Sequence, residues 1–331
     1  MKAVGLYKYL PIDHPESLLD LDLPRPKAAG RDLLVEIKAI SVNPVDTKRR
    51  APKDLVETQP KILGWDAAGI VREAGAEATL FRPGDEVYYA GSVVRPGSNC
   101  EFQLVDERIV GRKPANLSFA EAAALPLTTL TAWELMFERM GISKTGGHAG
   151  RTLLVLGGAG GVGSIAIQLA KKLAKLRVTA SASRAESSDW CRALGADAIV
   201  AHAGVADAGE LDYVLCLTAP EPYWGLLPKI VRPQGKVGLI VRTTRPVDLA
   251  ILQDKSIAVC LEGMFTRSNF QTGDMAAQHE LLDETAGLVE AGVLRTTIRQ
   301  NLGAISAGNL RRAHRLLEEG HVVGKIVLEG F

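Results

Sequence analysis

The sequence has few cysteines, and they stand far apart. Its 331 residues include four, Cys100, Cys191, Cys216 and Cys260, separated by 91, 25 and 44 positions, and no Cys-x-x-Cys pair occurs. Small secreted domains held together by disulfides have dense cysteines, so this class of protein is excluded. We expect reduced thiols and a cytoplasmic protein.

Long apolar runs and an excess of charge of either sign are also missing. No stretch reaches the roughly 18–20 apolar residues that a membrane-spanning helix needs, and the first residues lack the layout of a signal peptide. Lys and Arg number 39 against 38 Asp and Glu, the net charge is +1, and aromatic residues make up 5%. We therefore expect neither nucleic acid nor a membrane as a partner. The length predicts two domains.

What the sequence does have is a hydrophobic period that changes along the chain. Residues 1–117 contain short apolar runs broken by Pro and Gly, which predict a mainly β segment. From 151 to about 265, apolar strands alternate with helical stretches such as Val162–Leu173 and Ala185–Leu194, which predicts a parallel, doubly wound α/β sheet. The expected strands are Leu153–Leu156, Val178–Ser181, Ala198–Ala201, Tyr213–Leu217, Val237–Val241 and Ile257–Leu261.

Helix signals flank this alternating segment. Ser118 and Glu121 have the spacing of a capping box, and Pro126 is suited to the first turn of a helix over Leu127–Arg139. The last part of the chain predicts helices near 276–291 and 307–319 and a final strand over Lys325–Leu328.

The most specific motif follows the first strand of the alternating segment. Gly158-x-Gly160-x-x-Gly163 stands between that strand and an amphipathic helix. In dinucleotide-binding folds these glycines form the tight turn, admit the pyrophosphate and let the helix approach the strand, and the helix N-terminus attracts the phosphates. The alternative is a merely structural turn. The motif predicts a dinucleotide cradle, whose candidate residues are Gly158, Ala159, Gly160, Gly161, Val162 and Gly163.

The end of the second strand bears on which dinucleotide is bound. NAD-specific sites place Asp or Glu there to bind the ribose 2′-hydroxyl, whereas residues 179–184 read Thr-Ala-Ser-Ala-Ser-Arg. Ser183 can donate a hydrogen bond and Arg184 is positively charged, so both suit a 2′-phosphate. The alternative is a solvated Arg184, with Glu186 in the acidic role. We expect NADPH as the cofactor.

Motifs along nearly the whole chain resemble the medium-chain dehydrogenase/reductase superfamily. They are Ser41-Val-Asn-Pro-Val-Asp46, Gly64-Trp-Asp-Ala-Ala-Gly69, Pro83-Gly-Asp85, Leu125-Pro-Leu-Thr-Thr-Leu-Thr-Ala-Trp133, the glycine motif and Gly324-Lys-Ile-Val-Leu328. Within the superfamily the chain is most similar to the zinc-free quinone oxidoreductase branch, including proteins often labelled zinc-type alcohol dehydrogenase-like.

This resemblance implies a two-domain architecture. A GroES-like, β-rich catalytic domain would comprise residues 1–125 and 267–331, and a Rossmann NADPH-binding domain would comprise residues 126–266. It also places Thr131 beside the cofactor. A homodimer or homotetramer is expected, with the last strand of the nucleotide-binding sheet, within Ser256–Phe265, pairing between subunits.

The sequence departs from zinc-dependent members of the superfamily at the metal site. Those members bind catalytic zinc with Cys, His and Cys, and the matching positions here are Asn43, Trp65 and Leu127. Tryptophan and leucine do not coordinate Zn²⁺, and an asparagine amide is a poor ligand for it. Of the structural four-cysteine lobe of such enzymes only Cys100 is present. We therefore expect no metal.

The substituted positions supply the catalytic candidates. The resemblance places Asn43 on a loop facing the cofactor, where its amide would bind the substrate oxygen; the alternative is a turn residue bonded to its own backbone. Asp46 matches an acidic residue common to both branches, with loop support as an equal alternative. Trp65 is a flat wall for a stacked ring or part of the core.

Two further features are expected to be solvated. The basic run Lys48-Arg-Arg50 with Lys53 is interpreted as a solvent-exposed loop, with a positive rim for an anionic ligand as the alternative. His314 and His321, seven positions apart, are expected on an exposed face.

Together these observations predict an NADPH-dependent, zinc-independent oxidoreductase that transfers hydride to a quinone or an activated alkene such as an enone. Without zinc to stabilise an alkoxide, acceptors that disperse charge are favoured. Two alternatives stay open: a non-catalytic NADPH-binding sensor or RNA-associated protein, and a zinc-type alcohol dehydrogenase with substitute ligands.

Overall fold

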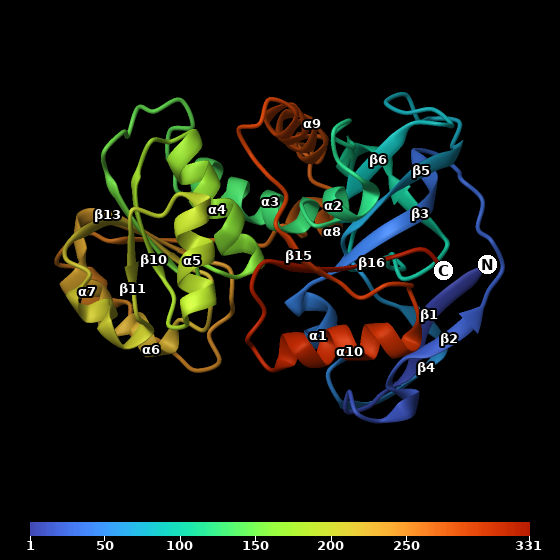
Figure 1. Ribbon diagram of the computed structural model, residues 1–331, viewed down its shortest axis with the longest axis horizontal. Helices are drawn as coiled ribbons and strands as arrows, with labels where there is room; N and C mark the ends of the chain where they lie inside the picture. The colour runs from blue at the N-terminus through green and yellow to red at the C-terminus, as the bar shows by residue number, and fades with distance from the viewer. The chain divides into compact units, whose positions relative to one another are not determined.

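The contacts of the chain divide it into two units in a computed structural model that describes residues 1–331 (Figure 1). Unit 1 comprises Met1–Leu127 and Phe265–Phe331, and unit 2 comprises Thr128–Met264. The boundaries therefore follow Leu127 and Met264, where the resemblance had placed them after Leu125 and Thr266.

Unit 2 is built on one parallel sheet of six strands in the order β11-β10-β9-β12-β13-β14. Helices α4 and α5 lie side by side on one face of this sheet (Figure 1). The central strand β9 is almost wholly buried, which explains its continuous apolar sequence. The strands are β9 (Thr152–Leu156), β10 (Arg177–Ser181), β11 (Ala198–Val200), β12 (Leu211–Cys216), β13 (Val231–Leu239) and β14 (Ala258–Leu261).

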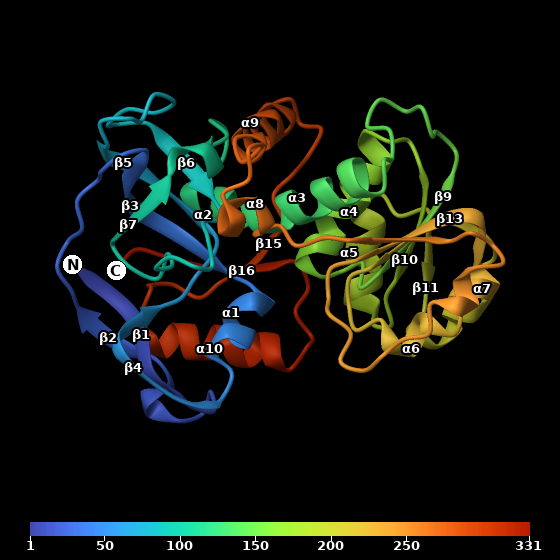
Figure 2. The ribbon, with the colours of Figure 1, turned by 180° about the vertical axis from the view of Figure 1, so that it is seen from behind.

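Helices connect these strands, and the expected alternation is confirmed. The longer ones are α4 (Gly161–Lys172) and α5 (Ala185–Leu194); α6 (Glu221–Trp224) and α7 (Leu227–Ile230) are single turns, seen from behind in Figure 2. The doubly wound α/β prediction is correct, because each apolar run became a strand of one sheet. The helix expected over Leu127–Arg139 is α3 (Pro126–Trp133), which continues as a π-helix over Glu134–Arg139.

Unit 1 is rich in β-structure. Its seven-stranded sheet runs β15-β16-β3-β5-β6-β8, with β7 also paired to β3, and a smaller sheet runs β2-β1-β4. The strands are β1 (Lys2–Tyr9), β2 (Leu19–Asp22), β3 (Asp32–Val42), β4 (Lys53–Ile62), β5 (Ala67–Ala74), β6 (Glu86–Tyr89), β7 (Phe102–Asp106), β8 (Val110–Arg112), β15 (Ile298–Asn301) and β16 (Lys325–Glu329).

Five helices lie wholly within unit 1. They are α1 (Pro44–Arg50), α2 (Phe119–Ala123), α8 (Thr266–Phe270), α9 (Ala277–Glu290) and α10 (Ala307–Glu318). The capping box at the start of α2 formed as expected, since Ser118 N donates to Glu121 Oε2 at 2.9 Å and Glu121 N donates to Ser118 Oγ at 3.3 Å. No helix of the protein combines the length and the apolar character that crossing a bilayer requires.

Two residues that were expected to be solvated are buried, whereas the others of these sets are exposed as expected, namely Lys48, Arg49, Lys53 and His321. Arg50 is buried at the end of α1, where its guanidinium donates to the Leu10 carbonyl oxygen at 2.6 Å and pairs with Glu318 on α10. His314, also on α10, is fully buried. Helices α1 and α10 lie side by side in both views (Figures 1 and 2), so their facing side chains leave the solvent.

Candidate functional site

The glycine turn of unit 2 joins β9 to α4, and its tight turn is one residue earlier than expected. Gly157 has φ +82°, a left-handed conformation that favours glycine. Gly158 has an ordinary φ, so the predicted turn role of Gly158 belongs to Gly157. The Gly-x-Gly-x-x-Gly spacing did not identify this residue because Gly157 lies directly before the motif.

The other glycines of the turn are needed for close packing. A Cβ on Gly158 would lie 2.8 Å from Ala180 Cβ, so this residue lets the turn approach β10. A Cβ on Gly163 would lie 2.4 Å from the Gly157 carbonyl oxygen, so α4 approaches the end of β9 only because position 163 has no side chain. A Cβ on Gly160 would meet only one atom within 4 Å, at 3.5 Å, so the backbone there faces open space.

Helix α4 begins at the turn, directly after the open position at Gly160. Gly160 is the N-cap of α4 and has no side chain that could accept hydrogen bonds from the first N–H groups of the helix. The Ser164 hydroxyl does not accept from them either, since it donates to the Gly160 carbonyl oxygen at 2.7 Å. The first N–H groups of a helix have no intrahelical acceptor and carry partial positive charge. This cradle, formed by Gly157 and the predicted residues Gly158, Ala159, Gly160, Gly161, Val162 and Gly163, fits the diphosphate of a dinucleotide.

The end of β10 lies beside the turn and carries the residues expected to select the cofactor. Gly157 N donates to Ser181 Oγ at 2.9 Å, which ties the turn to β10. Ser183 and Arg184 follow this strand and are both exposed, with Arg184 as the N-cap of α5. His202 N donates to Ser183 Oγ at 3.2 Å. No carboxylate stands between Ser181 and Arg184, and the next one, Glu186, is exposed in the first turn of α5.

Thr131 was expected beside the cofactor. It lies on α3, where it is 6% exposed, in the same unit as the glycine turn.

The catalytic candidates lie in unit 1, at a point where the ends of three neighbouring strands meet. Asn43 follows β3, Asp66 precedes β5 and Lys325 begins β16. Because β3 runs antiparallel to both β5 and β16, the end of β3 adjoins the start of the other two strands. The sheet therefore places these three residues together, although Asp66 and Lys325 are 259 positions apart.

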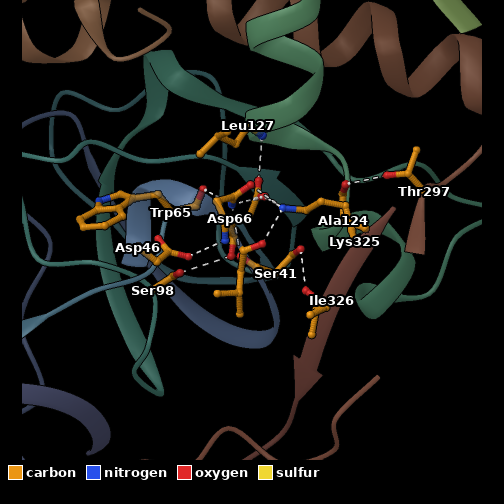
Figure 3. A network of polar contacts seen from close by, with 12 residues as sticks. Ser41, Asp46, Trp65, Asp66, Ser98, Ala124, Leu127, Thr297, Lys325 and Ile326 are labelled. Atoms are coloured by element: carbon orange, nitrogen blue, oxygen red, sulfur yellow. Dashed lines mark hydrogen bonds and ion pairs between the residues drawn. The ribbon is translucent and has the colours of Figure 1, made fainter. Parts of the chain in front are cut away.

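Their side chains form a buried hydrogen-bonded centre (Figure 3). Asn43 Nδ2 donates to Asp66 Oδ2 at 2.7 Å, and Lys325 Nζ donates to Asn43 Oδ1 at 2.5 Å and to Asp66 Oδ2 at 3.0 Å. The Leu127 amide donates to Asp66 Oδ1 at 2.8 Å. Since the oxygen and one N–H of the Asn43 amide are engaged within the protein, neither is directed to a substrate in this arrangement.

Asp46 supports the loop that carries Asn43. Its Oδ2 accepts the Asn43 backbone N–H at 2.7 Å, which closes the start of α1, while its Oδ1 is buried without a hydrogen-bond partner. Burial raises the pKa of Asp46 to about 7, opposed by the Asn43 amide and Lys325. Asp66 also has a raised pKa from burial, opposed first by the Lys325 charge.

Trp65 packs within unit 1. It is 1% exposed, its Nε1 donates to the Ser92 carbonyl oxygen at 3.0 Å, and its ring meets Phe265 edge-on with centroids 6.4 Å apart. A fully buried indole whose N–H is satisfied has the properties of a core residue.

Sequence reasoning missed Asp66 and Lys325 as members of the centre. Both stand in motifs that were recognised, Gly64-Trp-Asp66 and Gly324-Lys325. The available signal was a charged residue inside each otherwise apolar motif, which on burial requires a partner of opposite charge.

The residues at the zinc-ligand positions do not fit a metal. Asn43 gives its amide to Asp66 and Lys325, the Trp65 indole donates to a carbonyl oxygen, and Leu127 contributes only its backbone N–H. No group of three or more His, Cys, Asp or Glu side chains in the protein is arranged to hold a metal ion. All four cysteines are free thiols.

Comparisons with known proteins match both units. Residues 29–133 match the model of the alcohol dehydrogenase GroES-like domain, and residues 194–328 match the zinc-binding dehydrogenase model. A zinc-type alcohol dehydrogenase-like protein of Staphylococcus aureus is 39% identical over 99% of both chains. The 2-methylene-furan-3-one reductase of Solanum lycopersicum is 32% identical over 99% of this chain and 79% of its own.

Solved structures agree over the whole chain. A structure from Rhizobium etli CFN 42, assigned to the zinc-dependent alcohol dehydrogenases, superposes with a TM-score of 0.94 at 47% identity, covering 100% of this chain and 98% of that one. The quinone oxidoreductase of Coxiella burnetii superposes with a TM-score of 0.82 at 25% identity, covering 100% and 99%.

Proposed function

The chain belongs to the medium-chain dehydrogenase/reductase superfamily, and from this membership we propose that it is an NADPH-dependent, zinc-independent oxidoreductase acting on a quinone or an activated alkene such as an enone. The observation that carries the proposal is the glycine turn, because Gly158 and Gly163 are positions where a Cβ would collide with the protein, while Gly160 opens onto free space at a helix start. That geometry fits a diphosphate.

NADPH rather than NADH is supported by the residues after β10. Ser183 provides a hydroxyl and Arg184 a permanent positive charge, and both residues are exposed directly after β10. A carboxylate, which would repel a 2′-phosphate, is absent from residues 181–184.

When bound, a nicotinamide cofactor supplies the hydride. The chain's own residues bind and orient: the turn and the first amides of α4 hold the diphosphate, and Ser183 and Arg184 hold the 2′-phosphate. Asp46 and the buried centre fix the loop before α1. Trp65 and Leu127 offer no side-chain ligand to a Lewis-acid metal, and the Asn43 amide oxygen is already engaged by Lys325, so acceptors that disperse negative charge over a conjugated system are favoured.

The substrate class is also supported by relatives. The tomato protein is named for the reduction of 2-methylene-furan-3-one, which is an enone, and the Coxiella protein is named for quinones. We propose that this chain takes acceptors of these two chemical kinds.

A single assay tests the proposal. Purified protein, dialysed against a chelator, is mixed with NADPH or NADH and a panel of quinones, enones and simple aldehydes, and absorbance at about 340 nm is followed. Acceptor-dependent oxidation of NADPH with quinones or enones is expected. Tight NADPH binding without turnover would instead indicate a sensor, and activity towards aldehydes that requires added zinc would indicate an alcohol dehydrogenase.

We also propose a homodimer or homotetramer in which two subunits pair through β14. This strand pairs only with β13 in its sheet, and Leu261 at its end is 69% exposed, so an apolar sheet edge is left without a partner. Analytical ultracentrifugation of the protein and of Leu261→Lys measures whether the assembly exists and depends on this edge.

A further inference from the structure

The buried centre of unit 1 contains an ammonium group whose hydrogen-bonding capacity is fully used. Lys325 Nζ donates to Asn43 Oδ1 at 2.5 Å, to the Val42 carbonyl oxygen at 3.0 Å and to Asp66 Oδ2 at 3.0 Å. An ammonium has three donors and no acceptor, so these three oxygens account for all of them. The Lys325 side chain is 3% exposed, so the ammonium is buried away from bulk water.

The oxygens around Nζ are of the kinds that bind hard metal cations. They are an amide oxygen, a peptide carbonyl oxygen and a carboxylate oxygen, and they come from residues at or next to two of the three zinc-ligand positions. Figure 3 shows Lys325 and Leu127 reaching the same Asp66 carboxylate from different elements. The ammonium is therefore surrounded by oxygens of the kinds that bind a hard cation.

We propose that Lys325 is the resident cation of this centre: its ammonium takes the place of a metal among Asn43, Val42 and Asp66, orients the Asn43 amide, and keeps divalent cations out of the native protein. The proposal goes beyond the proposed reductase activity, and its test requires no turnover.

Charge balance supports this assignment. Asp66 and Lys325 form a buried pair of opposite charges, with Lys325 Nζ 3.0 Å from Asp66 Oδ2. This pair is balanced without any further cation. A divalent ion at these oxygens would lie within a few ångströms of the ammonium, in a region where water does not screen the repulsion.

Orientation of Asn43 is the second consequence. An asparagine amide can present its oxygen or its nitrogen to the same neighbour, and here Lys325 holds the oxygen while Asp66 holds the nitrogen. Removing the ammonium leaves both the Asn43 oxygen and the Asp66 carboxylate without their cation. Lys325 is thus a positioning residue for the loop between β3 and α1.

The experiment compares the wild-type protein with Lys325→Ala. The melting temperature is measured with MnCl₂ at about 1 mM and, separately, with methylammonium chloride. Binding of Mn²⁺ is measured from the decrease in the electron paramagnetic resonance signal of the free ion. For the wild type we expect no stoichiometric Mn²⁺ binding and no shift by methylammonium. For Lys325→Ala we expect a melting temperature lower by about 5–15 °C, partly restored by either cation.

Two control variants separate the cation site from a general loss of packing. Lys27→Ala removes an exposed lysine of the same unit and is expected to behave as wild type. Lys325→Ala combined with Asp66→Asn removes both charges, so it is expected to be more stable than Lys325→Ala alone and to gain nothing from Mn²⁺ or methylammonium. If Lys325→Ala is insoluble, the folding of this double variant still supports the proposal.

Several results would overturn it. Stoichiometric Mn²⁺ or Zn²⁺ in the wild-type protein would show that the centre admits a metal despite Lys325. A Lys325→Ala protein as stable as wild type, or one destabilised yet insensitive to both cations, would show that the ammonium is not the cation these oxygens require. A double variant that does not fold would show that the loss is one of packing and not of charge.

Discussion

His314 is a titratable residue that the fold holds without hydrogen bonds. Both of its ring nitrogens are buried without a partner on α10, next to the buried Arg50. Burial, with the Arg50 charge as the second cause, lowers the pKa of His314 to about 3. The ring is therefore neutral in the folded protein at pH values where an unfolded histidine is already charged.

This environment predicts sensitivity to acid. Between the unfolded pKa of about 6.5 and the folded value, the unfolded chain binds one more proton at this site, so stability falls as pH falls, by up to about 1.4 kcal/mol per pH unit. We expect His314→Leu to flatten this decline and to melt at a higher temperature than wild type at about pH 5. Melting curves from pH 4 to 8 measure it, with the exposed His321→Gln as control. Parallel acid limbs for wild type and His314→Leu would contradict the prediction.

Arg184 is the residue on which cofactor preference is expected to depend. Its guanidinium follows β10 at the surface, and we expect Arg184→Ala to raise the KM for NADPH by about tenfold while leaving that for NADH nearly unchanged. Initial rates with both cofactors check this. Glu186→Gln is the matched control. If Glu186→Gln loses affinity for NADH while Arg184→Ala has no effect, then Glu186 binds the ribose of the cofactor and the prediction for Arg184 is wrong.

At the scale of secondary-structure elements, the junction of β9 and α4 depends on the absence of a side chain. We expect Gly163→Val to lower the melting temperature and to abolish NADPH binding, because its Cβ would lie 2.4 Å from the Gly157 carbonyl oxygen and push the helix away from the strand. Gly225→Ala, where a Cβ meets nothing within 4 Å, should bind NADPH as wild type does. Quenching of protein fluorescence by NADPH measures the affinity of both variants. Equal affinity of Gly163→Val and Gly225→Ala for NADPH would contradict the prediction.

The π-helix after α3 shows what the sequence pattern left undetermined. An α-helix was expected throughout Leu127–Arg139, but Met140 N donates to the Leu135 carbonyl oxygen at 2.9 Å, five residues back. Helical periodicity of 3.6 and the wider π turn give similar apolar spacing over six residues, so the sequence alone does not separate them.

This π segment contributes Glu134 to a buried carboxylate pair with Glu262, which follows β14. Burial and the neighbouring Glu134 raise the pKa of Glu262 to about 8, with Glu138 adding to the rise and Arg139, whose Nε is 3.0 Å from Glu262 Oε2, opposing it. Between about pH 4.5 and pH 8, Glu262 therefore holds a proton in the folded protein that it has released in the unfolded chain.

This difference in bound protons fixes the direction in which stability changes with pH. Stability from this site is present at low pH and is lost as pH rises from about 4.5 through about 8. We expect Glu262→Gln to remove this loss, so that the variant exceeds wild type in melting temperature at about pH 9 and not at about pH 5. Glu138→Gln, which removes a more exposed carboxylate of the same segment, should change the profile much less. A wild-type melting temperature that is flat from pH 5 to 9 would contradict the raised pKa of Glu262.

At the scale of the whole molecule, local and long-range features differed in how far the sequence predicted them. The six strands of unit 2 carry a local signal, namely apolar runs, and their prediction was correct. The glycine spacing located the turn to within one residue, since the left-handed residue is Gly157. Asp66 and Lys325 meet only because β16 returns to pair with β3, and no local pattern specifies that pairing. No local pattern specifies the burial of His314 either, because it depends on the packing of α10 against α1.

This topology predicts that the two units differ in their ability to fold alone. The sheet of unit 2 is completed within one continuous segment, so we expect a fragment of residues 126–264 to fold and melt cooperatively. Unit 1 is discontinuous: residues 1–127 lack β16, the neighbour of β3, and leave Asp66 without its ammonium. That fragment should not melt cooperatively unless residues 265–331 are supplied in trans. Circular dichroism and amide dispersion in NMR spectra measure both, and cooperative melting of residues 1–127 alone would refute the dependence on the C-terminal strand.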